Sequence, residues 1–142
     1  MELKSVVIGG AIAGLVAGII NLIVSSILGV AGLAGITEPI PMDDTSVGVF
    51  VVATMVTIIL IGIIYGVIYT KLAPVIPGEA RIKGVYYGLL IWIMMDIVAA
   101  MLMVSHVGAT YMAFGFVIGG LLVWPAYGFV LVMMLERIEG TE

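Results

Sequence analysis

Charged side chains are scarce in this sequence, and cysteine is absent altogether. Only 10% of the 142 residues are charged, and none is cysteine. A soluble domain carries about a quarter charged residues, because its surface has to face water. The shortage of charge therefore excludes an ordinary soluble domain. The lack of cysteine excludes disulfides, thiolate catalysis and cysteine-ligated zinc or iron–sulfur centres.

Basic residues are also few: five Lys and Arg stand against nine Asp and Glu, for a formal net charge of −4. Nucleic-acid binding depends on clustered Lys and Arg that neutralise phosphates, so we expect no nucleic-acid partner. The chain has a single histidine, no Gly-x-Ser-x-Gly sequence and no glycine-rich phosphate loop. We therefore expect no metal site, no cofactor and no catalytic residue, and predict that the protein is not an enzyme.

Apolar residues are what the sequence has in abundance, at 63% of the chain, with a mean hydropathy of +1.35. Lipid tolerates such a surface, and a spanning helix needs about 20 mostly apolar residues. Backbone groups in lipid must bond within their own segment, so each apolar window predicts a helix. The expected fold is all-α: one domain, 1–142, forming a polytopic membrane protein embedded in the lipid bilayer. Its four transmembrane helices are predicted at about 5–36, 46–73, 82–105 and 109–135.

The first of these windows is longer than a bilayer requires. It either tilts, or its glycine-rich tail at 29–36 lies outside the membrane. The orientation follows from the basic residues: if the chain crosses the membrane four times, all of them fall on the same side of the membrane. The positive-inside rule therefore predicts a multi-pass protein of the cell membrane with both termini in the cytoplasm. The residues on that side are Lys4, Lys71, Arg81, Lys83 and Arg137.

Glycines recur at four-residue spacing in every window. In lipid, close backbone approach over small residues supplies much of the packing between helices, so the pattern predicts Gly-x-x-x-Gly packing faces. These faces serve either packing within one bundle or homo-oligomerisation. Because four helices alone make a thin bundle, we expect in either case an assembly with further copies of the chain or with another membrane protein. The dipeptide Tyr-Gly recurs at 65–66 and 127–128, as two related hairpins would produce. The glycines concerned are Gly10, Gly14, Gly18, Gly62, Gly66, Gly84, Gly88, Gly115 and Gly119.

One acidic residue, Asp96, interrupts the apolar run of the third window. A charged side chain at that depth costs about 2.5–3.5 kcal/mol on insertion scales, and such residues usually face the bundle interior. A rise of about 1.5 Å per residue puts Asn21 of the first window at a similar depth. We therefore expect an intramembrane polar site in which Asn21, Ser25 or both hydrogen-bond Asp96. Thr54 and Thr57 of the second window are further contributors.

Two functions fit this pattern. If Asp96 handles an ion, a proton or a substrate, the protein is a small channel- or transporter-like membrane protein. If Asp96 only joins helices, the protein is a non-catalytic structural or accessory subunit that assembles with itself or with another membrane protein. A water-filled path to Asp96 favours the first function, and a dry bundle with a large apolar face favours the second.

Several stretches carry a resemblance to a known family. They are "KGVYYGLLIWIMMDIV" at 83–98, "GGLLVW" at 119–124 and the opening "GLVAG" at 14–18. In these features the chain resembles the YagU-like family of small, largely uncharacterised four-helix inner-membrane proteins. That family has a similar glycine pair, followed by histidine at the place that Asp96 takes here. The resemblance implies a small four-helix protein of an inner membrane.

Overall fold

The computed structural model describes residues 2–30, 44–107 and 112–140. Over these ranges the chain is helical apart from Glu2, Gly140 and a turn over residues 73–79, so the predicted all-α class is confirmed for the described part. Two of the segments, η1 and η2, are π-helical and continue directly into α-helix. The elements in chain order are α1 (Leu3–Val30), α2 (Asp44–Leu72), α3 (Ala80–Trp92), η1 (Ile93–Ile97), α4 (Val98–Val107), η2 (Met112–Gly119) and α6 (Gly120–Glu139).

Four helical stretches are long and apolar enough to cross a membrane, which is consistent with a multi-pass membrane protein. The last helix continues to Glu139, whereas its predicted window ended at 135. The added turn carries Arg137, and a cation there is favoured by the partial negative charge at a helix C-terminus. The tail of the first window, 31–36, lies outside the described residues. The four stretches are Leu3–Ile27, Val51–Leu72, Ala80–Leu102 and Phe116–Glu139.

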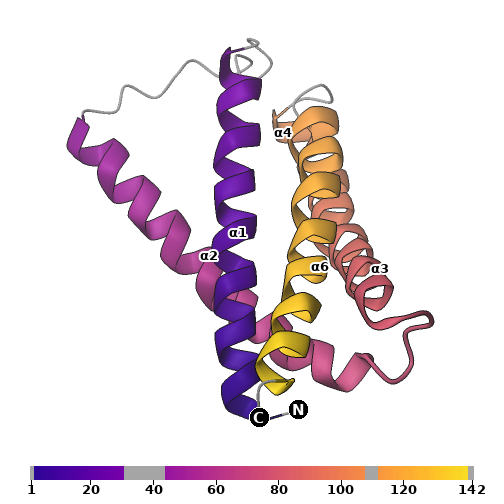
Figure 1. Ribbon diagram of the computed structural model, residues 1–142. Coiled ribbons are helices and arrows are strands. Elements are labelled where there is room, and N and C mark those ends of the chain that lie inside the picture. The colour runs from indigo at the N-terminus through magenta and orange to yellow at the C-terminus, as the bar shows by residue number, and fades with distance from the viewer. Residues whose placement is uncertain (1, 31–43, 108–111, 141–142) are drawn as a thin grey trace.

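The helices form two hairpins that meet between α1 and α6. The helices α1 and α6 run side by side, α3 packs against α6, and α2 crosses α1 so that its amino-terminal half leads away from the other helices (Figure 1). Helix α6 therefore lies between α1 and α3. The first turn of α1, the last turn of α6 and the turn between α2 and α3 share one end (Figure 1). We call it the basic end, because it carries all five Lys and Arg residues.

The α1–α2 pair crosses where two glycines face each other. A Cβ atom on Gly10 would lie 2.7 Å from the carbonyl oxygen of Gly62, and one on Gly62 would lie 2.6 Å from that of Gly10. One turn further along α1, a Cβ on Gly14 would lie 2.8 Å from the carbonyl oxygen of Ile58. These obstacles are backbone atoms, which cannot rotate aside. Any side chain at Gly10 or Gly62 would therefore force the two helices apart.

The α3–α6 pair repeats this arrangement. Gly84 faces the carbonyl of Gly128, and Gly88 faces the carbonyl of Trp124. Each contact has a counterpart in the first pair. Gly84 and Gly88 lie 74 positions after Gly10 and Gly14, and their partners Gly128 and Trp124 lie 66 positions after Gly62 and Ile58. The two hairpins are thus related in structure, as the sequence predicted. The recurring Tyr-Gly dipeptide has the wrong register, however, because the counterpart of Gly128 is Gly62 and not Gly66.

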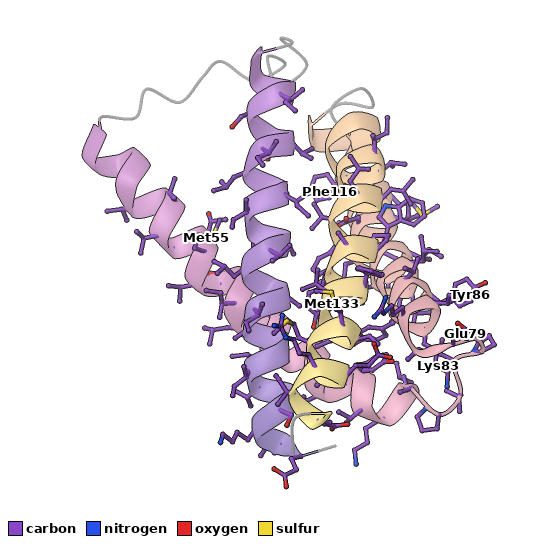
Figure 2. All side chains as sticks on the ribbon, viewed as in Figure 1. Met55, Glu79, Lys83, Tyr86, Phe116 and Met133 are labelled. Carbon is purple, nitrogen blue, oxygen red and sulfur yellow. The ribbon has the colours of Figure 1, made fainter. Side chains whose placement is uncertain are left out.

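The other glycines that were predicted to pack between helices make looser contacts, or their contacts are outside the part that the structure describes. A Cβ on Gly18 would lie 3.1 Å from the Met55 sulfur, which points toward α1 from α2 (Figure 2). On Gly66 it would lie 3.3 Å from the carbonyl oxygen of Val6. Gly119 is buried, whereas the surroundings of Gly115 fall outside the described residues.

Tyrosine hydroxyls join α2 to the second hairpin in the half of the bundle near the basic end. Tyr127 is fully buried, and its hydroxyl donates to the Gly62 carbonyl oxygen at 2.6 Å. Tyr87 is also buried and donates to the carbonyl oxygen of Tyr65 at 2.6 Å. A buried hydroxyl needs such a partner, because desolvation without a hydrogen bond is costly. Both bonds end on α2 and hold its carboxyl-terminal half against α3 and α6.

We predict that Gly62→Ala destabilises the protein by about 1–3 kcal/mol, since the added methyl has to displace the backbone of α1. Reversible unfolding in mixed detergent micelles, followed by circular dichroism, measures the change. Gly48→Ala is the matched control in the same helix, because a Cβ on Gly48 would meet nothing within 4 Å. Equal stability of the two variants would contradict the close crossing.

Candidate functional site

Asp96 accepts a hydrogen bond from α6, the other helix of its own hairpin. It lies in η1 and is partly buried. The indole nitrogen Nε1 of Trp124, in α6, donates to the Asp96 carboxylate oxygen Oδ2 at 2.8 Å. A hydrogen bond to an ionised carboxylate is about twice as strong as one between neutral groups. Trp124 therefore fixes the position of the carboxylate against α6.

Gly120 makes room for this carboxylate. A Cβ atom on Gly120 would collide with the Asp96 carboxylate oxygen Oδ2, and it would lie 2.9 Å from Cδ1 of Trp92. Trp92 is held in turn by its own indole N–H, which donates to the Val117 carbonyl oxygen at 3.0 Å. The four residues Trp92, Asp96, Gly120 and Trp124 form what we call the indole–carboxylate site. A larger residue in place of Gly120 would expel the carboxylate from it.

Two π-helical segments border this site. Asp96 lies inside η1, while η2 ends directly before Gly120, and the two segments contact each other. A π-helical turn is wider than an α-helical one; such turns are rare and are often found at functional sites. The sequence contains no signal for either segment, because both are apolar stretches that match an α-helix equally well.

The expected partners of Asp96 lie elsewhere. Asn21 and Thr54 are partly buried, whereas Ser25 and Thr57 are exposed. Within the described ranges no hydrogen bond joins any of the four to Asp96; Trp124 is the donor in their place. The physical reason is that α6 lies between α1 and η1, so residues of equal depth on those two elements do not meet. A count of helical rise predicts depth, but it does not predict which helix stands between two residues.

An aromatic cluster extends from the site toward the basic end. The Trp124 ring meets the Tyr65 ring edge-on with centroids 5.7 Å apart, and the Tyr127 ring at 6.1 Å. Tyr69 and Tyr87 continue the cluster with centroids 5.1 Å apart. Edge-to-face aromatic pairs of this kind stabilise a packed interior. The core near the basic end thus combines aromatic rings with buried aliphatic residues such as Leu131 and Leu135, and Asp96 lies next to the aromatic ring of Trp124.

Positive charge is confined to the basic end. There, Arg81 of α3 pairs with Glu136 of α6 at 3.4 Å. The Lys83 Nζ donates to the Ala73 carbonyl oxygen at 3.3 Å, beside the turn that also carries Glu79 (Figure 2). Consequently, no basic side chain lies beside Asp96 in the part of the chain that the structure describes. An ionised Asp96 would face a neutral donor and apolar surroundings.

The comparisons with known proteins add no family or function. No protein-family model matches the chain, and neither the curated proteins nor the solved structures contain a match. The resemblance to the YagU-like family therefore stays a prediction. Within the described residues no group of three or more His, Cys, Asp or Glu side chains could hold a metal ion.

We predict a coupling free energy of about 0.6–1.7 kcal/mol between Asp96 and Trp124, the range of hydrogen bonds between membrane helices. A double-mutant cycle with Asp96→Ala and Trp124→Phe measures it by unfolding in detergent micelles. A second cycle, with Asp96→Ala and Asn21→Ala, should give a coupling near zero. Coupling to Asn21 without coupling to Trp124 would refute the indole–carboxylate site.

Proposed function

We propose that this chain is a small channel- or transporter-like membrane protein, rather than an enzyme, in which Asp96 handles the transported ion, proton or solute. One observation carries the proposal: a carboxylate within a candidate spanning helix is held by a neutral indole and, among the described residues, has no Lys or Arg beside it. Acidic residues at such a depth are costly and commonly mark an ion or proton pathway. The two π-helical segments that border Asp96 support the same conclusion.

We further propose that the four helices span the cell membrane with both termini in the cytoplasm. This orientation is supported by the collection of all five Lys and Arg residues at the basic end. The aromatic cluster would then close the bundle toward the cytoplasm, and Asp96 would lie on its outer side. In lipid the close glycine contacts would act as Gly-x-x-x-Gly packing faces within one bundle.

The test is proton flux into liposomes that contain the purified protein. A potassium diffusion potential, negative inside, drives entry, and a trapped pH-sensitive dye reports it. We expect wild-type protein to raise the entry rate and Asp96→Asn to lower that added flux roughly tenfold or more, since the amide cannot bind or release the proton. Ser26→Ala is the control, because that hydroxyl donates to the Leu22 carbonyl of its own helix.

Two outcomes would contradict the proposal. One is a proton flux with Asp96→Asn that equals the wild-type flux, which would mean that conduction does not depend on the carboxylate. The other is a wild-type flux no faster than that of protein-free liposomes, which would favour the second candidate function.

That second candidate is a structural or accessory subunit that assembles with itself or with another membrane protein. It is favoured by the poor burial of α2. Only 11% of the apolar window of α2 is buried, compared with 17% in Ala80–Leu102 and 39% in α1 and in the last helix. Assembly along α2 would cover side chains such as Val52 and Val56, which are 62% and 51% exposed.

Cysteine crosslinking tests self-assembly without background, because the chain has no cysteine of its own. If copies meet along α2, Val56→Cys should give a disulfide-linked dimer when membranes are oxidised. Leu102→Cys in α4, which is 73% exposed, should stay monomeric. Equal crosslinking at both positions would indicate random collision, and none at Val56→Cys would argue against assembly along this face.

A further inference from the structure

Among the described residues, no Lys or Arg compensates the charge of Asp96. Its hydrogen-bond donor, Trp124, is neutral, and the Lys and Arg residues lie at the basic end. A carboxylate in apolar surroundings is stable only when it is protonated or paired with a positive charge. Asp96 is therefore either protonated or paired with a cation that the described Lys and Arg residues do not supply.

The neighbours of Asp96 do not suit a metal ion. Hard cations such as Mg²⁺ and Ca²⁺ take six or more oxygen ligands. Here the carboxylate is bordered by two indole rings, those of Trp92 and Trp124, and by the backbone of Gly120. Both indole nitrogens act as donors, one to Asp96 and the other to the Val117 carbonyl. An inorganic cation would lose its hydration water at this site and gain few oxygen atoms in return.

The two tryptophans themselves indicate a different cation. The chain has only two, Trp92 and Trp124, and both border Asp96. In membrane proteins tryptophan is enriched at the membrane–water interfaces, near helix ends. Trp92 instead lies at the middle of the Ala80–Leu102 span. Indole is the side chain that most strongly attracts an organic cation to its face, and a nearby carboxylate supplies the opposite charge.

We infer that the indole–carboxylate site binds a lipophilic, monovalent organic cation of the ammonium or phosphonium type. Its charge pairs with Asp96, and its apolar groups pack on Trp92 and Trp124. This inference rests on the proposed function and adds the class of the transported solute. Binding balances in charge at the site, because the carboxyl releases one proton when it takes up one monovalent cation. Without the cation the same carboxyl carries protons alone, which is the flux that the liposome assay measures.

The exposure around the site fits a ligand that arrives through lipid. Asp96 is partly buried, while the adjacent Met95 and Val98 are 46% and 47% exposed. On the other side the aromatic cluster fills the bundle with buried rings such as Tyr87 and Tyr127. A cation with apolar groups can cross the lipid-facing surface to Asp96, whereas a hydrated inorganic ion cannot do so without losing its water.

Equilibrium dialysis of radiolabelled tetraphenylphosphonium against the full chain in lipid nanodiscs tests the inference. We expect saturable binding, and Asp96→Asn should weaken it roughly tenfold or more, since the amide removes the charge. Trp92→Leu should weaken binding about threefold or more, and Trp92→Phe should restore part of it, because the phenyl ring keeps an aromatic face. Ser26→Ala should bind like wild type.

Competition identifies the class of ligand. Tetrabutylammonium should displace the probe, whereas Na⁺ and Mg²⁺ should not. In parallel, the probe should change the fluorescence of Trp124 in the Trp92→Phe variant, which reports contact in a protein whose carboxylate is intact. Circular dichroism and gel filtration of Asp96→Asn check that its loss of binding does not reflect unfolding.

The inference is overturned if the probe binds Asp96→Asn as tightly as wild type, if empty nanodiscs take up as much, or if Mg²⁺ competes as well as tetrabutylammonium. If the probe does not bind but proton flux still depends on Asp96, the solute class is wrong and the proposed function stands. If neither binding nor flux is found, both fall.

Discussion

Close approach of helix backbones over glycine is the contact on which the arrangement of this protein depends. Helices that lie in lipid gain little from hydrophobic association, and close van der Waals contact between their backbones then contributes much of the packing. Gly10 with Gly62 and Gly84 with Gly128 bring two helix pairs to a distance that any side chain would prevent. Gly120 allows a close approach in the same way, because the carboxylate of Asp96 occupies the space that a side chain at position 120 would fill.

The two hairpins share the positions of their glycine contacts but differ in the side chains beside those contacts. In the first, Gly14 faces Ile58; in the second, the corresponding Gly88 faces Trp124. The indole that fixes Asp96 therefore stands where the first hairpin has an aliphatic side chain. No acid follows Gly14 within α1 either. Among the described residues, the second hairpin alone carries the carboxylate with its indole donor and the π-helical segments.

The bundle is also unequal along its length. Near the basic end, hydroxyl–carbonyl hydrogen bonds from Tyr87 and Tyr127 hold α2 against the second hairpin. Toward the other end α2 leads away from the bundle (Figure 1). Asp96 lies at the transition between these two regions, next to packed aromatic rings on one side and exposed apolar residues on the other. The partly buried Asp96 is thus packed on one side and borders exposed apolar residues on the other.

The sequence by itself determined the helices, because four long apolar stretches follow one another. A helix satisfies the backbone hydrogen bonds of such a stretch within the stretch itself, as a membrane-spanning segment would require. The sequence also singled out Asp96 as the one acid inside an apolar run, and it placed glycines where helices later cross. Only the tertiary structure decided the partner of Asp96. The depth of a residue along its helix follows from residue count, but its neighbours depend on which helices pack together. Because α6 packs between α1 and α3, Asp96 accepts its hydrogen bond from Trp124 and not from Asn21.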